Sequence, residues 1–241
     1  AALGLEAPAG LDMRTIPPPR MPEALAAGEI DAFCVGEPWG SFAVETGAAE
    51  IVLPGVAIWA FAPEKVLAVR REDAEDPASA ALLRAVWRSG RWLAEAENRM
   101  TASEILARPA YVDVSAELIE RVMTGRLVVD AEGGERTAPR FIEFFDGAAT
   151  FPWRSQALWI ALRWAARAGV DRAEAARVAR SCYRADVYRR VLGPLGADLP
   201  GASEKVEGAL AARSPVASSS GEMFLGPDSF FDGSVFDPPP G

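Results

Sequence analysis

The sequence predicts an α/β fold with a helix-rich C-terminal half, and three observations lead to this class. Short helical and strand-like segments alternate over residues 17–53, which is the rhythm of a parallel α/β sheet. Apolar residues then recur at helical spacing from residue 77 onward, as in amphipathic helices. Pro, Gly and Ser dominate from residue 198 to the end, which indicates an extended tail.

The alternating region follows a proline-rich start. Residues 17–31 (PPPRMPEALAAGEID) predict a short helix that Gly28 closes in the C′ position. Residues 30–35 (IDAFCV) form an apolar run of strand length. A second short helix is expected over 40–47 and a second strand over 51–53.

A third strand is expected over residues 65–69, directly after Pro63. From there on the pattern changes to helices, because Leu, Val and Trp residues return every three or four positions between arginines. The expected helices are 77–97, 100–107, 115–125, 154–168 and 171–192.

The composition excludes several chemistries. The chain has 241 residues, of which 50% are hydrophobic and 24% charged. This length and composition are sufficient for one large domain or for two lobes. The absence of histidine excludes Ser-His-Asp and Cys-His nucleophiles and His-ligated metals. Cys34 and Cys182 lie too far apart in sequence for a C-x-x-C motif. The sequence therefore predicts a binding protein and not an enzyme, with no metal and no cofactor.

The net charge and the hydropathy limit the classes of binding partner that we expect. A net charge of −9 argues against nucleic acid, which needs a positive face, and no apolar run reaches the roughly 18 residues of a membrane span. Residues 1–30 carry no signal-peptide pattern and begin with Ala1. We expect the chain to be part of a longer protein, so a signal region would not be visible here.

Gly36-Glu37-Pro38-Trp39 is the first candidate site. It follows an expected buried strand, where an α/β sheet opens a crevice for ligands. Glycine lets the backbone approach a ligand, and a carboxylate beside an aromatic ring is a plausible contact. The alternative is a turn with a solvated Glu37 and a Trp39 that packs within a lobe.

Lys65 is the second candidate, because the basic residues are otherwise arginines except for Lys205. A compact ammonium with three donors suits a small oxyanion. The alternative is a surface lysine without a specific role. We expect Lys205 itself to be solvated.

A third feature is the segment Phe151–Ser155 (FPWRS), which opens a helix with Thr150 as a possible cap. An anion could bind at this helix start. We expect instead that the aromatic residues anchor the helix to the core.

Three stretches and the C-terminal end carry a family resemblance: residues 17–39 (PPPRMPEALAAGEIDAFCVGEPW), 58–69 (IWAFAPEKVLAV), 151–164 (FPWRSQALWIALRW) and 230–238 (FFDGSVFDP). Together they resemble the nitrate-binding family of solute-binding proteins, the NrtA/CmpA/NasS group. The resemblance covers nearly the whole chain from residue 17 to residue 238 and implies the type II periplasmic-binding fold, with two lobes and a ligand in the cleft between them.

The resemblance also implies a domain organisation. Residues 1–58 would be the C-terminal part of the second lobe, and 59–200 the return to the first lobe with appended helices. Residues 201–241 would be an extended tail packed on the lobes. The N-terminal part of the two-lobe fold would be missing, and we expect this piece to bind a ligand poorly alone.

By resemblance, Gly36, Glu37 and Lys65 would line the cleft, with Trp39 a weaker candidate. Nitrate is held by donors alone, and Lys65 would supply charge while the backbone N–H near Gly36 supplies a directed bond. Glu37 would position a donor or contact an accompanying cation. The sequence departs from the family at Ala62 and Gln156, where histidine is common.

The implied function is a receptor that delivers nitrate or nitrite to ABC permease subunits, with bicarbonate the less expected ligand. The alternative is a sensor that binds the same anion and releases an antiterminator protein. The receptor would be periplasmic or membrane-associated, and the sensor cytoplasmic. An enzyme on the same fold is disfavoured, because no nucleophile–base pair is visible.

Overall fold

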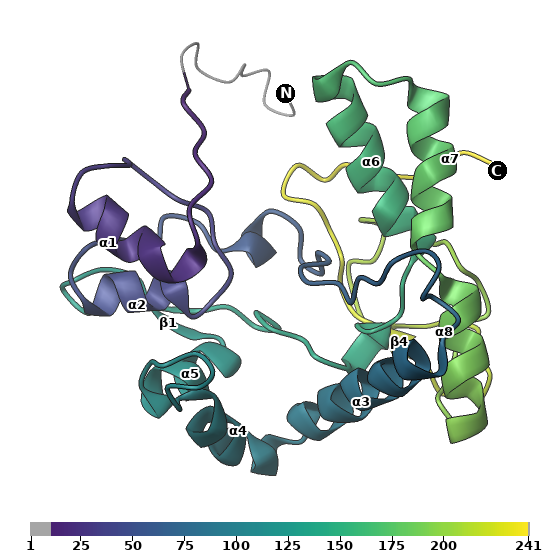
Figure 1. Ribbon diagram of the computed structural model, residues 1–241, viewed down its shortest axis with the longest axis horizontal. Coiled ribbons are helices and arrows are strands. Elements are labelled where there is room, and N and C mark those ends of the chain that lie inside the picture. The colour runs from purple at the N-terminus through teal and green to yellow at the C-terminus, as the bar shows by residue number, and fades with distance from the viewer. Residues whose placement is uncertain (1–10, 241) are drawn as a thin grey trace. The chain divides into compact units, whose positions relative to one another are not determined.

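The structure is a computed structural model that describes residues 11–240 (Figure 1). Its helices and strands are α1 (Met21–Ala26), α2 (Trp39–Glu45), α3 (Pro77–Ala94), α4 (Arg99–Leu106), α5 (Ala116–Met123), β1 (Arg126–Val128), β2 (Glu135–Thr137), α6 (Arg154–Ala168), α7 (Arg172–Cys182), α8 (Ala185–Leu192), β3 (Ser214–Pro215) and β4 (Phe224–Leu225).

The helices follow the local signals in the sequence. Pro77 stands at the start of α3, where its missing N–H has no cost. Ser115 Oγ accepts a bond from the N–H of Leu118 at 3.1 Å and caps α5. Gly169, at φ 66, closes α6 in the left-handed region. The helices expected near these positions are confirmed.

The single helix expected over 171–192 is wrong, because the chain forms α7 and α8 instead. Asp171 Oδ1 caps α7 by accepting the N–H of Glu174 at 2.8 Å. Tyr183 and Arg184 then leave the helical region, with ψ 98 and ψ 66. This break lets the chain turn while the apolar faces of both helices stay buried.

The three strands expected at 30–35, 51–53 and 65–69 are also not formed. Ile51 N donates to Val129 O at 2.8 Å, but within residues 11–240 no strand partner accompanies 30–35 or 65–69. A strand needs a neighbour for its N–H and C=O groups. The strands observed are short antiparallel pairs, β1 with β2 and β3 with β4.

Two compact units make up the chain. One combines the residues up to Ile58 with Ala96–Ile142, and the other combines Trp59–Glu95 with the residues from Glu143 onward. Both units are discontinuous, whereas the expected domains follow one another along the chain with boundaries at 58 and 200. The assignment of 1–58, 59–200 and 201–241 to lobes and tail stays a prediction, and residues 1–10 and Gly241 lie outside the described part.

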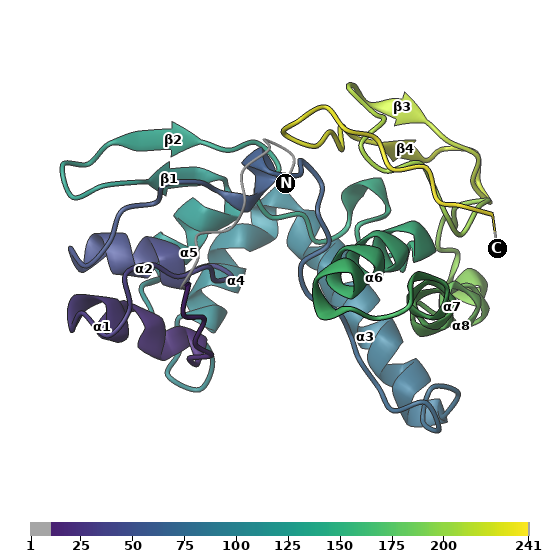
Figure 2. The ribbon, with the colours of Figure 1, turned by 90° about the horizontal axis from the view of Figure 1, so that it is seen from above.

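The first unit packs its helices under the β1–β2 hairpin, which lies alongside α2 and α5 (Figure 2). Leu127 of β1 is 1% exposed and packs with Val122 and Ala138. Leu118 of α5, fully buried, lies in a second cluster. Because α5 is apolar on both these sides, it forms the centre of this unit.

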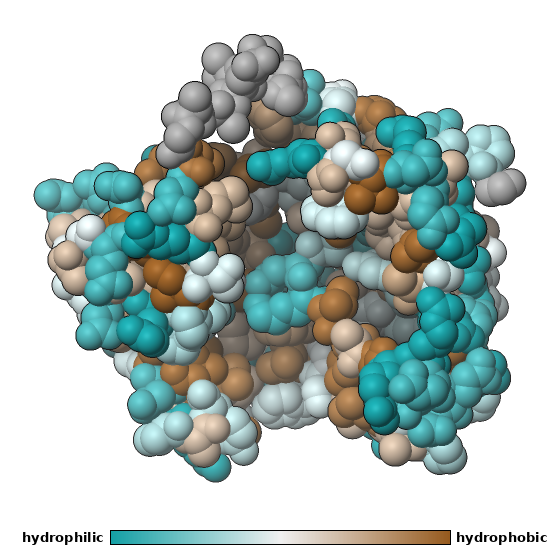
Figure 3. Space-filling view, turned by 45° about the horizontal axis from the view of Figure 1, so that its top comes forward, coloured by the Kyte–Doolittle hydropathy of each residue, from teal (hydrophilic) through white to brown (hydrophobic). Residues whose placement is uncertain are grey.

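The second unit is built on α6, which runs side by side with α7 (Figure 1). Leu158 and Leu162 of α6 pack against Ala179 of α7. A larger cluster joins Trp87 of α3 to Leu192 of α8. On the face in Figure 3, apolar side chains appear among polar ones. Leu82 of α3 is one of the exposed apolar residues of this unit, at 47%.

Candidate ligand-binding site

Glu37 lies in the loop before α2, in the first unit, and is half-buried. Its Oε2 accepts the N–H of Ser41 at 3.1 Å, so the carboxylate satisfies one of the free donors at the helix start. A Cβ on Gly40 would stand 3.0 Å from Glu37 Oε1. The structure therefore gives Glu37 a local role as a cap for α2, and Gly36 precedes it directly in the same loop.

Trp39, the first residue of α2, is half-buried. Its ring meets Phe42 edge-on, with centroids 6.2 Å apart, and it packs against the cluster around Leu118 and Ile119. These contacts match the alternative in which the tryptophan packs within its unit. Trp39 is not fully buried, so part of its surface remains accessible.

Lys65 lies in the second unit, on an extended segment. Its side chain is 75% exposed, and Nζ bonds Oε1 of the neighbouring Glu64 at 2.5 Å. An exposed ion pair of this kind contributes little to the free energy of folding. The Lys65 ammonium can therefore leave Glu64 and bind another anion at little cost in free energy. The structure thus places Gly36 and Glu37 in one loop, with Trp39 directly after it at the start of α2, and carries Lys65 on a different unit.

Over residues 11–240, no three His, Cys, Asp or Glu residues are grouped so that they could hold a metal ion. Cys34 and Cys182 are both exposed, free thiols. No helix among these residues is both long enough and apolar enough to cross a membrane.

Lys205 is the residue for which the sequence analysis was wrong. Its side chain is 12% exposed, not solvated, and Nζ bonds Glu207 Oε2 at 2.6 Å and Asp228 Oδ2 at 2.5 Å. Glu207 Oε1 in turn accepts the hydroxyl of Ser155 at 2.5 Å. Both carboxylates are almost fully buried. A buried lysine needs partners of this kind, because an unpaired charge in the interior is costly.

This network is anchored at both ends. Ser155 Oγ accepts the N–H of Lys205 at 3.1 Å, and Asp228 Oδ1 accepts the N–H of Leu210 at 2.9 Å. Burial raises the pKa of the Glu207 carboxyl, and Lys205 partly offsets the effect. The amino-acid sequence could have indicated the Lys205–Glu207 pair of this network. Residues two apart on an extended chain point to the same side.

Three aromatic rings meet beside this network. Trp59 lies 5.0 Å from Trp159 and 4.7 Å from Phe230, measured between ring centroids. Trp159 and Phe230 stack at 5.4 Å. We call this set the aromatic trio. It joins three segments that are far apart in sequence and was not anticipated.

The segment at the start of α6 supports anchoring rather than anion binding. Phe151 and Trp153 are each 3% exposed. Ser155, a possible anion donor, is already bonded to Glu207. Thr150 does not cap the helix, and its hydroxyl bonds the Tyr188 hydroxyl at 2.7 Å.

Comparison with known proteins gives consistent matches. The model of the NMT1-like family matches residues 1–107. The nitrate/nitrite binding protein NrtA of Synechococcus elongatus is 27% identical over 99% of this chain and 50% of its own length. The bicarbonate-binding protein CmpA of a Synechococcus strain is 25% identical over 99% of this chain and 52% of its own. The chain thus spans about half the length of these binding proteins.

A shorter match reaches another kind of transport protein. The nitrate import ATP-binding protein NrtC of Synechocystis is 35% identical over 62% of this chain and 23% of its own length. Among solved structures, the periplasmic nitrate-binding protein NrtA from Synechocystis matches 98% of this chain and 58% of its own, with a TM-score of 0.80 and 24% identity. This confirms the periplasmic-binding-protein fold that the resemblance implied. The chain is thus similar over nearly its whole length to the solute-binding proteins NrtA and CmpA, and it shares the periplasmic-binding-protein fold of NrtA.

Proposed function

We propose that this chain is part of a solute-binding protein that holds a small oxyanion, nitrate or nitrite, in a cleft between two lobes for delivery to an ABC importer. The observation that carries the proposal is the match to nitrate- and bicarbonate-binding proteins along 99% of the chain. The match to an ATP-binding protein of nitrate import supports the same transport context. The sensor hypothesis has no comparable support.

Lys65 is the residue whose positive charge is proposed to bind the anion. Nitrate carries one negative charge and accepts bonds through three oxygens, and it needs donors that no buried partner already holds. Lys65 fits because its side chain is 75% exposed and its bond to Glu64 joins two solvated groups. Lys205, the other lysine, does not fit, because both buried carboxylates already hold its ammonium.

Gly36 and Glu37, which belong to the first unit, are the further proposed contacts. The backbone at Gly36 would offer an N–H to the anion. Glu37 would act indirectly, because a carboxylate repels an anion, and its bond to the Ser41 N–H holds the loop in shape. Trp39 would form one wall of the site beside this loop.

The test is titration calorimetry of the full-length gene product with sodium nitrate, nitrite and bicarbonate, with chloride as the control anion. We expect nitrate or nitrite to bind and Lys65→Ala to weaken the binding by about 1.5–3 kcal/mol, as for a charge-assisted bond. Arg70→Ala is the matched control, because it removes another exposed cation of the same segment, one paired with Asp73. Absence of binding by all three anions would overturn the function, and equal effects of the two variants would remove Lys65 from the site.

A proposed location follows from the same relatives. The solved NrtA of Synechocystis is described as periplasmic, and we propose that this protein acts outside the cytoplasmic membrane beside its permease. Fractionation of the native cells, with detection by antibody, tests this. Recovery in the cytosolic fraction would contradict it and favour the sensor alternative.

A further inference from the structure

We infer that the C-terminal tail acts as a strap that positions the segment carrying Lys65, with Phe230 and Trp59 as its positioning residues. The tail from residue 203 to residue 238 contacts α6 and the start of that segment, all within the second unit. The inference rests on the proposed function, because it takes Lys65 as the residue that meets the anion.

The first link fixes the tail to α6. Lys205 lies between the carboxylates of Glu207 and Asp228, and Ser155 of α6 bonds Glu207. Glu207 also exchanges two backbone bonds of 2.9 Å with Phe236. Glu207 therefore joins the two ends of the tail to each other and, through Ser155, to the start of α6.

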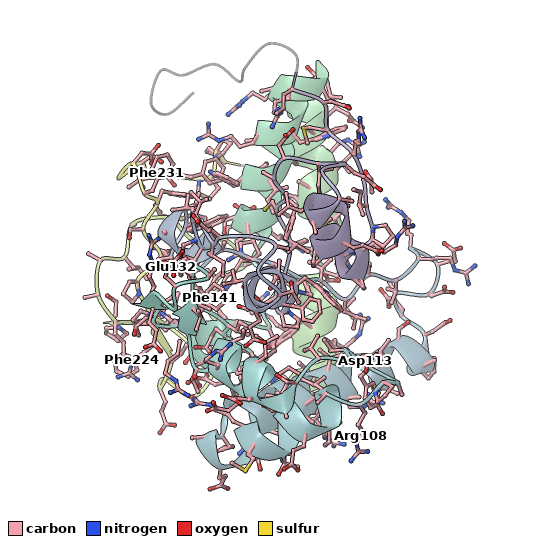
Figure 4. The ribbon with its side chains drawn as sticks, turned by 90° about the vertical axis from the view of Figure 1, so that its left-hand side faces the viewer. Arg108, Asp113, Glu132, Phe141, Phe224 and Phe231 are labelled. Atoms are coloured by element: carbon pink, nitrogen blue, oxygen red, sulfur yellow. The ribbon has the colours of Figure 1, made fainter. Side chains whose placement is uncertain are left out.

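The second link places Phe230. Asp228, held by Lys205, lies two residues before it, and Phe230 is 8% exposed and stacks on Trp159. Ser155 and Trp159 are four residues apart on α6 and so lie on one face of the helix. The next residue, Phe231, lies at the edge of the molecule in Figure 4 and is 55% exposed. Of this pair, Phe230 is the one that packs inward.

The third link reaches the Lys65 segment. Phe230 forms an isolated antiparallel bridge with Trp59, and Ala60 N donates to Ser229 O at 3.0 Å. Trp59 is 5% exposed, covered by both rings of the trio. The tail thus acts as the strand partner of the chain at residues 59–60.

The geometry beyond this anchor explains why it matters for Lys65. Ala62 N bonds Trp59 O at 3.3 Å, and no backbone bond follows in the described chain until Asp73 N donates to Arg70 O. Lys65 is three residues past Ala62, which is a span of at most about 11 Å. Pro63 stiffens this span by fixing its φ. On its N-terminal side, the backbone at Lys65 is therefore held by the trio and its strap.

The Phe230 ring is tightly packed on the side of Gly208. Gly208 has a φ of +83, and a Cβ there would lie 2.5 Å from Phe230 Cδ2. The buried indole N–H of Trp59 has no hydrogen-bond partner among residues 11–240, so within this range the ring is held by packing. Replacement of Trp59 by phenylalanine should accordingly keep the anchor, whereas alanine should release it.

Hydrogen exchange of the full-length protein, read by mass spectrometry, tests the strap directly. We expect Phe230→Ala and Trp59→Ala to speed exchange at Ala60 and Ala62 at least tenfold, and Trp59→Phe to restore wild-type protection. Phe231→Ala is the matched control and should leave exchange unchanged. If Phe230→Ala does not fold, Phe230→Leu takes its place. Equal exchange in the Phe230 and Phe231 variants would overturn the strap.

Nitrate titration of the same variants tests whether the strap affects anion binding. We expect Phe230→Ala to weaken binding about tenfold at a temperature where thermal melting shows it fully folded, and Trp59→Phe to bind as the wild type does. Unchanged affinity despite faster exchange would overturn the positioning role. If the wild type binds no anion while exchange responds as expected, the proposed function fails and the strap stands.

Discussion

Lys205 and Asp228, 23 residues apart in sequence, are joined by a bond of 2.5 Å between Nζ and Oδ2. The same ammonium holds Glu207, so one positive charge faces two buried negative ones. In this chain one lysine is therefore structural and the other, Lys65, is exposed. The two make a matched pair for measuring what burial does to a lysine.

Lys205→Met should destabilise the protein by about 3–5 kcal/mol, because it leaves two carboxylates buried without their counter-ion. Lys65→Met makes the same chemical change at a side chain that is 75% exposed and should cost less than about 0.5 kcal/mol. Urea denaturation followed by circular dichroism measures both. Similar midpoints for the two variants would contradict the network described here.

The helices were predictable because their signals are local. Ser115 and Gly169 mark helix ends within a few residues of the chain, and the apolar stripes of α3 and α6 show their period directly. The helix after the Gly36-Glu37 loop was predictable for the same reason, whereas the buried strand expected before this loop is not formed.

The strands and the buried network were not predictable, because their partners are distant. Residues 65–69 have the apolar pattern of a buried strand, yet Val66 is 61% exposed, since pattern alone does not supply a neighbouring strand. The partner of Lys205 at Asp228 lies on a tail whose Gly and Pro residues carry no periodic signal. The trio likewise joins residues that no local rule connects.

Gly125→Ala should destabilise the first unit more than Gly47→Ala. Both glycines have φ +72, so the left-handed conformation costs a side chain the same, roughly 1–2 kcal/mol. A Cβ on Gly125 would also overlap the carbonyl oxygen of Ala138, whereas nothing lies within 4 Å at Gly47. We expect a further cost of roughly 1–3 kcal/mol at Gly125. Thermal melting of the two variants checks this, and equal melting temperatures would contradict it.

Asp186 should make stability fall in acid. The hydrogen bond from Arg184 lowers the pKa of this carboxyl from 3.8 to about 2. A lowered pKa adds stability that is present above the unfolded pKa and lost as pH falls toward the folded one. Asp186→Asn should therefore be less stable than the wild type at about pH 5, and the difference should shrink at about pH 2. Urea midpoints at both pH values measure it, and a difference that does not change with pH would contradict the assignment.

Leu67→Lys should reduce self-association of this chain. Val66, Leu67 and Val69 are 61%, 43% and 44% exposed, and over the described residues their backbone groups have no hydrogen-bond partner. Extended apolar segments in this state pair edge to edge with other copies, and a lysine on such an edge opposes pairing.

Val235→Lys, at a residue that is 57% exposed on the tail, is the control for added charge. We expect sedimentation velocity to show concentration-dependent dimers in the wild type and in Val235→Lys, with fewer in Leu67→Lys. A wild type that stays monomeric as its concentration rises, or equal behaviour of both variants, would show that this segment does not mediate pairing.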